Sequence, residues 1–271
     1  MMKFKILPIL TVLALLAVPA FGQSNRLTIA GSTTVLPIAQ AAAEAYMDLH
    51  PEINISVRGG GSSVGIASVM TGTANIGNAS RHVKTKELAT ARENGIELYE
   101  NIVANDGIAV VVNPSNTING LTTAQLKSIY AGEVQNWKEL GGTNKPIVII
   151  SRDTSSGTFE VFNKLVMKNV PVAASALKLA SNNAVASTIS NTPGSIGYVG
   201  LGYLNDSVKA ITIDKVMPTK KTIQSKEYPI ARTLQMYTND EPTGLTKKFI
   251  DFILSTEGQK IVEEQGFISL N

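Results

Sequence analysis

The sequence contains no cysteine, and this absence removes several classes of function at once. Disulfides, thiolate nucleophiles and cysteine-ligated zinc sites all need a residue that the chain does not have. A lipid-modified cysteine, a usual tether of bacterial surface proteins, is excluded as well. The 271 residues include only two histidines, His50 and His82, which are too few for a typical histidine metal site and are unlike a catalytic triad.

A large excess of one charge is also missing. The chain has 24 Lys and Arg residues against 21 Asp and Glu residues, and two of the basic ones, Lys3 and Lys5, lie in an N-terminal segment that we expect to be removed. The remaining charges nearly balance. We therefore expect no nucleic-acid partner and no binding to an anionic membrane surface.

The N-terminal segment has the features of a secretory signal peptide. Residues 1–5 are short and basic, residues 6–19 are almost entirely apolar, and Ala20-Phe21-Gly22 offers small residues to a signal peptidase. The apolar run is shorter than the ~20 residues of a membrane-spanning helix, which argues against a retained anchor. We predict a signal peptide over residues 1–22, cleaved after Gly22 or after Ala20, and a periplasmic protein without a lipid anchor.

Short apolar segments of strand type alternate with segments of helix type through the rest of the chain, which indicates an α/β fold. The pattern predicts strands at residues 27–30, 53–57, 74–77, 108–112, 147–150, 196–199 and 228–238. It predicts helices at residues 36–49, 66–70, 84–93, 122–130, 159–167, 246–254 and 257–264.

One sequence pattern occurs three times: a predicted strand ends, a loop of Gly, Ser and Thr follows, and a predicted helix begins directly after it. The three loops cover residues 30–34, 59–63 and 151–158. Amide groups at a helix N-terminus point outward and carry about half a positive charge, and glycine lets a ligand approach the backbone closely. Arg152, inside the third loop, adds a full charge and a planar fork suited to two oxygens.

Together these features predict a site for a small oxyanion that needs no metal or other cofactor. Each loop alone is more typical of ordinary helix capping than of an anion site, so the prediction depends on their combination. None of the loops has the Gly-Lys-Ser/Thr ending of a P-loop or a full GxGxxG pattern, which argues against a nucleotide.

The residues of these loops also match a known family. The chain resembles the substrate-binding proteins of the high-affinity phosphate ABC importer over almost all of its mature length, through AGSTTVLPIAQ, RGGGSSVGIASVMTGTANIGNASR, DGIAVVVNP, SRDTSSGTFEVF, PGSIGYVG and YPIARTLQMYT. This resemblance implies the type II periplasmic binding protein fold, in which two α/β lobes enclose a ligand in the cleft between them. Two crossing strands, near residues 104–108 and 228–232, would join lobe 1 (residues 23–105 and 231–271) to lobe 2 (residues 106–230).

The resemblance further implies a ligand, its binding residues and a partner. The ligand would be inorganic phosphate, the partner would be the permease subunits of an ABC transporter, and the protein would be a monomer without enzymatic activity. The residues at the matching positions are Ser32, Thr33, Thr34, Ser62, Ser80, Arg152, Ser156, Gly157 and Thr158.

One position departs from the family pattern. Several members place an aspartate after the serine that matches Ser80, where it can accept the proton of hydrogen phosphate, but this chain has Arg81. Sulfate carries no such proton, so a buried acceptor would discriminate against it. Asp106 is our candidate for a substitute acceptor, although an ordinary turn role before Gly107 is also consistent. Arg81 would contact the anion or face solvent at the rim of the cleft, and Asp153 would pair with Arg152.

Three other functions stay open at this point. A receptor for sulfate, molybdate or tungstate would use the same three loops and Arg152. A phosphatase on the same fold would need an activated nucleophile or a metal, for which the sequence offers no evident residues. A phosphate sensor or an adhesion protein would bind without transport.

Overall fold

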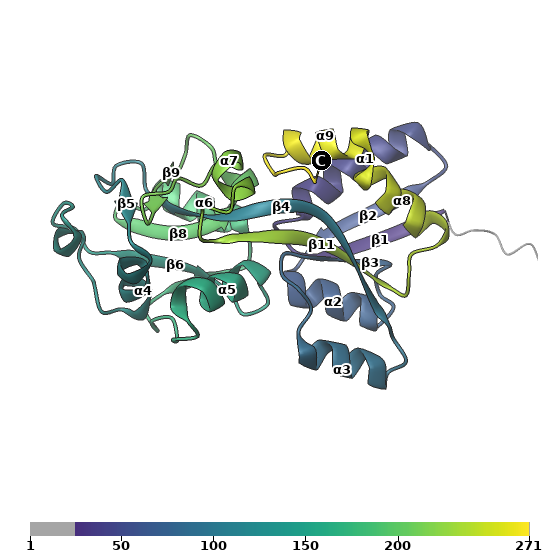
Figure 1. The fold of residues 1–271 in the computed structure, drawn as a ribbon, viewed down its shortest axis with the longest axis horizontal. Coiled ribbons are helices and arrows are strands. Elements are labelled where there is room, and N and C mark those ends of the chain that lie inside the picture. The colour runs from purple at the N-terminus through teal and green to yellow at the C-terminus, as the bar shows by residue number, and fades with distance from the viewer. Residues whose placement is uncertain (1–24, 271) are drawn as a thin grey trace, which may run out of the picture.

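The computed structural model describes residues 25–270 (Figure 1), so the predicted signal peptide lies outside the described residues. The strands in this part of the chain are β1 (Arg26–Gly31), β2 (Asn54–Gly59), β3 (Ile76–Ala79), β4 (Leu98–Val112), β5 (Gly120–Leu121), β6 (Val148–Arg152), β7 (Leu177–Leu179), β8 (Ser195–Gly200), β9 (Lys209–Ala210), β10 (Thr212–Ile213) and β11 (Ala231–Asn239).

Helices alternate with these strands, as the sequence predicts. The α-helices are α1 (Leu36–Leu49), α2 (Ser62–Met70), α3 (Thr85–Glu93), α4 (Thr123–Ala131), α5 (Gly157–Phe162), α6 (Asn182–Asn191), α7 (Lys220–Gln224), α8 (Gly244–Leu254) and α9 (Thr256–Glu264). Two 3-10 helices, η1 (Trp137–Leu140) and η3 (Leu201–Tyr203), and a π-helix, η2 (Asn163–Met167), complete the described chain.

One sheet of nine strands passes through both halves of the molecule in Figure 1. Its order is β2-β1-β3-β11-β4-β8-β6-β7, with β9 also paired to β4. The long strands β4 and β11 are antiparallel at its middle, and Asp106 lies opposite Arg232 in their register. The last residues of β4 leave β11 and pair with β8. These two strands therefore connect a half that contains β1, β2 and β3 to a half that contains β6, β7 and β8.

Each half has its own apolar core. In the first half, Ile29, Ile38 and Phe249 belong to a core between β1, α1 and α8. In the second half, Tyr198 of β8 stacks on Phe162 of α5, with ring centroids 4.0 Å apart. Because each half buries its own apolar residues, the junction between them is free to carry polar groups.

Parallel pairing brings the three Gly/Ser/Thr loops to this junction. Strand β1 is parallel to β2 and β3, and β6 is parallel to β7 and β8. The loops that follow β1, β2 and β6 each lead directly into a helix, α1, α2 and α5. In open α/β sheets, ligands bind outside the carboxyl ends of the strands, which is where these loops lie.

Several element boundaries differ from the sequence predictions. Helix α2 begins at Ser62 rather than near Ile66, and β4 begins ten residues before the predicted start, at Leu98. The predicted helix over residues 159–167 divides into α5 and the π-helix η2. Helix α6 was not predicted. Within residues 25–270, no helix is both long enough and apolar enough to span a membrane.

Candidate functional site

The first loop is positioned by a glycine that no other residue could replace. Gly31 ends β1 with φ at +131°, and a Cβ atom there would lie 2.3 Å from the carbonyl oxygen of Asn78. The hydroxyl of Ser32 accepts the amide of Thr34 at 3.1 Å, which closes the turn into α1. The side chain of Ser32 thus stabilises its own loop, and the hydroxyls of Thr33 and Thr34 reach residues of the second half.

Arg152 lies at the end of β6 and is 1 % exposed. Its Nε atom donates to the carbonyl oxygen of Leu179 at 3.0 Å, and Nη2 donates to that of Ala180 at 2.9 Å and to Thr33 Oγ1 at 3.2 Å. Among the described residues, Nη1 has no hydrogen-bond partner and no carboxylate lies within ion-pair distance of the guanidinium. Burial lowers the pKa of Arg152, and the nearby charge of Asp153 opposes this shift.

The expected pairing of Asp153 with Arg152 is wrong. The Oδ1 atom of Asp153 accepts the amide of Ser155 at 2.8 Å and also its hydroxyl. This short turn stabilises the third loop, because an Asp side chain readily accepts the amide two residues later. Two backbone carbonyl groups orient Arg152 instead, so its charge is not neutralised by a neighbouring carboxylate.

Hydroxyl groups from both halves meet beside Arg152. Thr34 Oγ1 lies 3.1 Å from Thr158 Oγ1, and both residues are 1 % exposed. The side-chain amide of Asn182, at the start of α6, donates to Thr34 Oγ1 at 2.9 Å and to Thr33 Oγ1 at 3.3 Å. These contacts join the first loop to α5 and α6 directly across the junction.

Ser62, Ser80 and Gly157 form a second contact between the halves. Ser62 Oγ accepts the amide of Ser80 at 3.0 Å and lies 3.3 Å from its hydroxyl oxygen. A Cβ atom on Gly157 would lie only 2.3 Å from Ser62 Oγ and 2.7 Å from Ser80 Oγ. Ser156 does not project its hydroxyl into this contact, because that group caps α5 by accepting the amide of Phe159 at 3.2 Å.

Asp106 is fully buried at the junction and paired with Arg232, its neighbour across β4 and β11. Arg232 Nε donates to Asp106 Oδ2 at 2.9 Å, and Nη2 lies 2.8 Å from the same oxygen. Asp106 Oδ1 accepts the amide of Leu201 at 2.9 Å. Burial raises the pKa of Asp106 above its ordinary value, although the charge of Arg232 and the backbone amide donors oppose the shift. The alternative interpretation of Asp106 as a turn residue is wrong, because Asp106 lies within the long strand β4.

Arg232 links the buried pair to the hydroxyl groups. Its Nη1 atom donates to the carbonyl oxygen of Ser80 and to Thr158 Oγ1, each at 3.1 Å, and its Nη2 atom donates to Thr34 Oγ1 at 3.3 Å. Because Asp106 compensates its charge, Arg232 adds donors to the site without adding much net charge. The net positive charge of the site comes from Arg152.

The expectation that Arg81 faces solvent is wrong, because its side chain is 5 % exposed. The alternative, that Arg81 contacts the anion, stays a prediction. The Nη1 and Nη2 atoms of Arg81 donate to the two carboxylate oxygens of Glu87 at 2.8 and 2.7 Å, and Nη2 also donates to Ser63 Oγ. A bidentate pair with Glu87 leaves the guanidinium little capacity for an anion.

Three site residues were missed by the sequence predictions: Asn182, Tyr203 and Arg232. Asn182 lies in an Ala-, Ser- and Asn-rich segment with no clear period. Tyr203 donates its hydroxyl to the carbonyl oxygen of Thr33, and burial raises its pKa to about 12. Arg232 could have been predicted from the sequence. It lies on a strand predicted to cross the cleft, where a buried charged residue needs a partner.

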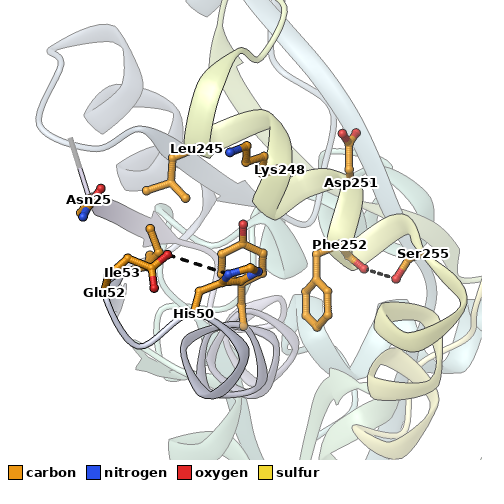
Figure 2. Close-up of a pocket in the computed structure, with 10 residues that line it drawn as sticks. Asn25, His50, Glu52, Ile53, Leu245, Lys248, Asp251, Phe252 and Ser255 are labelled. Carbon is orange, nitrogen blue, oxygen red and sulfur yellow. Dashed lines mark hydrogen bonds and ion pairs between the residues drawn. The ribbon is translucent and has the colours of Figure 1, made fainter. Parts of the chain in front are cut away.

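A separate groove of about 520 Å³ lies between the end of α1 and α8 (Figure 2). It is lined by His50, Glu52 and Asp251, among others, and the ring of His50 packs on Tyr46 with centroids 4.6 Å apart. It lies one helix length, about 20 Å, from the loop that begins α1. Two carboxylates in its wall make it unsuitable for an anion. Within residues 25–270, no group of three or more His, Cys, Asp or Glu side chains could hold a metal ion.

Two α/β halves joined by two strands, with a cationic cluster of hydroxyl and amide donors between them, define a two-lobed receptor for a small anion. A family model described as "PBP superfamily domain" matches residues 19–257, and the chain belongs to this superfamily. Its fold is the type II periplasmic binding protein fold.

Named relatives share this architecture. The phosphate-binding protein PstS of Bacillus subtilis is 39 % identical over 247 residues, which cover 90 % of this chain and 81 % of the relative. A phosphate ABC transporter substrate-binding protein from Clostridium perfringens, solved with bound phosphate, has a TM-score of 0.85 and 37 % identity and covers 91 % of this chain and 100 % of its own. An ABC-type phosphate transport receptor from Vibrio cholerae has a TM-score of 0.73 and 34 % identity and covers 89 % and 99 %.

Proposed function

We propose that this protein captures inorganic phosphate in the cleft between its lobes and delivers it to the permease subunits of an ABC importer. The observation that carries the proposal is Arg152, a fully buried guanidinium with a free Nη1 donor and no carboxylate partner among the described residues. A buried charge without a partner is costly, so an anion held beside it would supply the missing compensation. The names of the relatives support phosphate as that anion and a transport receptor, rather than an enzyme, as the class.

The side chains that we propose as ligand donors are those that converge around Arg152: Thr33, Thr34, Ser62, Ser80 and Thr158. Gly157 would contribute its backbone amide at the start of α5, where an anion is favoured. Ser32 and Ser156 would act by stabilising their loops, because their hydroxyl groups already accept backbone amides. Arg232 and Asn182 join this set, since each donates to at least two of its members or their backbone.

Asp106 is our proposed acceptor for the proton of hydrogen phosphate. A carboxylate oxygen has two acceptor positions, and Asp106 Oδ1 uses one of them for the Leu201 amide. A carboxylate this deeply buried would repel the unprotonated oxygens of sulfate, which would give the site its preference. Arg81 has no part in this discrimination.

We further propose that the lobes comprise residues 23–105 with 231–271, and residues 106–230. The antiparallel pairing of β4 with β11 supports this division, because both proposed boundaries fall where Asp106 faces Arg232. Export to the periplasm by cleavage of residues 1–22, the absence of a lipid anchor and a monomeric state belong to the same proposal.

Anion competition tests the proposed ligand. Mature protein would be unfolded and refolded to strip bound ligand, then incubated with radiolabelled phosphate and an excess of sulfate, molybdate or tungstate. We expect phosphate to be retained against all three competitors. Displacement by sulfate would overturn the proposed role of Asp106, and displacement by molybdate or tungstate alone would identify a receptor for one of those anions.

A further inference from the structure

A cluster of ion pairs lies across the mouth of the cleft, outside the proposed anion site. Glu160 belongs to α5, two residues after Thr158, and its side chain is 18 % exposed. One carboxylate oxygen, Oε2, lies 3.0 Å from Arg81 Nε, and the other, Oε1, lies 2.6 Å from Lys84 Nζ. Arg81 and Lys84 follow β3 in lobe 1, so Glu160 joins the second lobe to the first through two cations.

The other half of the cluster belongs to lobe 1 alone. Glu87 in the first turn of α3 binds both terminal nitrogens of Arg81 and accepts the Lys84 amide at 2.9 Å. Arg81 is therefore held in place by its own lobe, and only its Nε edge faces Glu160. A cation fixed beforehand loses little side-chain entropy when the lobes meet, which makes the pair across the cleft more favourable.

The cluster borders the proposed anion donors. Arg81, Lys84 and Glu160 line a groove of about 400 Å³ together with Arg232. Thr158, on the same helix as Glu160, faces inward to Thr34 and Arg232. Helix α5 thus presents one face to the proposed anion and another to the cations of lobe 1.

We propose that Glu160 is a positioning residue that stabilises the closed arrangement of the lobes by binding Arg81 and Lys84, and thereby slows the release of the anion without contacting it. This inference rests on the proposed phosphate-binding function. The proposal also gives Arg81 a role. Arg81 stabilises the closed arrangement, although its position in the family pattern often carries an acceptor for the ligand proton. The pair is partly buried, so salt screens it less than an exposed surface pair.

Release kinetics test this proposal. The rate of phosphate release would be measured by stopped flow for the wild type, Glu160→Gln and Lys84→Met, with Glu133→Gln as a control that removes the same charge from an exposed site in the second lobe. We expect release to accelerate about 5- to 20-fold in Glu160→Gln and less in Lys84→Met, with association nearly unchanged, as is usual for contacts formed after encounter. The Glu133→Gln protein should release phosphate at the wild-type rate.

A second measurement reports closure without depending on phosphate. The chain has no cysteine, so Lys86→Cys on α3 and Ala124→Cys on α4, both exposed, give two specific labelling sites in different lobes. We expect the label-to-label distance distribution of the unliganded protein to shift toward longer distances when Glu160→Gln is added. Unchanged release and an unchanged distance distribution would overturn the role of Glu160. Failure of the wild type to bind phosphate, with the distance shift intact, would instead refute the proposed function.

Discussion

Two arginines with buried side chains lie at the junction of the lobes, and their charges are compensated in opposite ways. Arg232 forms an ion pair with Asp106, and this pair links the two crossing strands β4 and β11. Arg152 donates only to backbone carbonyl groups and a threonine hydroxyl, and one of its donors remains unused among the described residues. Arg232 is therefore paired within the fold, whereas Arg152 keeps an unused donor, which we propose binds the ligand.

Glu87 leads to a prediction about pH. Burial by itself would raise the pKa of Glu87, but the hydrogen bond from Arg81, the Lys84 amide and the charges of both residues lower it more, so it lies below its ordinary value of 4.5. Ionised Glu87 therefore stabilises the fold above about pH 4.5, and this contribution is lost as the pH falls through the lowered pKa.

The variant Glu87→Gln should lower the free energy of unfolding by about 1 kcal/mol at pH 6, discounted for solvent screening of this partly exposed group. The difference from the wild type should shrink as the pH falls through the lowered pKa of Glu87, because the wild-type carboxylate then becomes protonated. Urea unfolding at a series of decreasing pH values checks this, and glutamine is suitable because it still caps α3. A difference that does not depend on pH would contradict the ionised pair.

At the residue level, the sequence pattern singled out Arg152, which lies at the buried end of β6 and donates to Thr33 of the first loop. Its role in anion binding stays a prediction. Arg81 was misassigned because its partners, Glu87 and Glu160, come from two different helices, and one of them lies 79 positions away in the chain. Contacts of that kind depend on how the lobes meet, which local patterns do not contain.

Among the elements, the loops that begin α2 and α5 bring the lobes into direct backbone contact. The amide of Ser63 donates to the carbonyl oxygen of Ser155 at 3.1 Å, and the hydroxyl of Ser155 donates to the carbonyl oxygen of Gly60 at 3.3 Å. Gly157 faces Ser62 and Ser80 across the same contact with no room for a side chain. Small residues in these loops therefore determine how closely the lobes approach.

We expect the substitution Gly157→Ala to hinder closure of the lobes. Gly157 does not have a positive φ, so alanine fits the backbone and favours the helix of the isolated lobe. Its methyl group would meet Ser62 and Ser80 only when the lobes are together, and we expect phosphate binding to weaken by about 1–3 kcal/mol. Phosphate titration measures this loss, and urea unfolding of the unliganded protein serves as the control. Wild-type affinity in this variant would contradict closure over Gly157.

The elements were predictable to different degrees for physical reasons. Helix α1 has the bounds that the pattern predicts, because Pro37 marks its first turn and its apolar face is continuous. The capping box at Thr122 also forms, with the Thr122 hydroxyl accepting the Gln125 amide. The first part of β4 was missed because it is largely exposed and lacks alternation, and it is held by pairing with β11 rather than by its own pattern.

The whole molecule consists of two lobes, each with its own apolar core. Two sets of polar contacts between the lobes bear on the ligand: the donors around Arg152, and the ion pairs of Glu160. An anion would strengthen the first set, and the second would slow its release. Binding and closure are thus parts of one equilibrium, in which the ligand stabilises the closed arrangement by mass action.

Titration calorimetry on protein stripped of bound ligand tests whether Arg152 holds phosphate in this cleft. Wild type and Arg152→Ala would be titrated with phosphate under the same conditions, with circular dichroism to confirm that both are folded. We predict one phosphate per wild-type molecule and a loss of about 2–5 kcal/mol of binding free energy in the variant. No phosphate binding by the wild type, or a loss below about 1 kcal/mol in Arg152→Ala, would contradict the account.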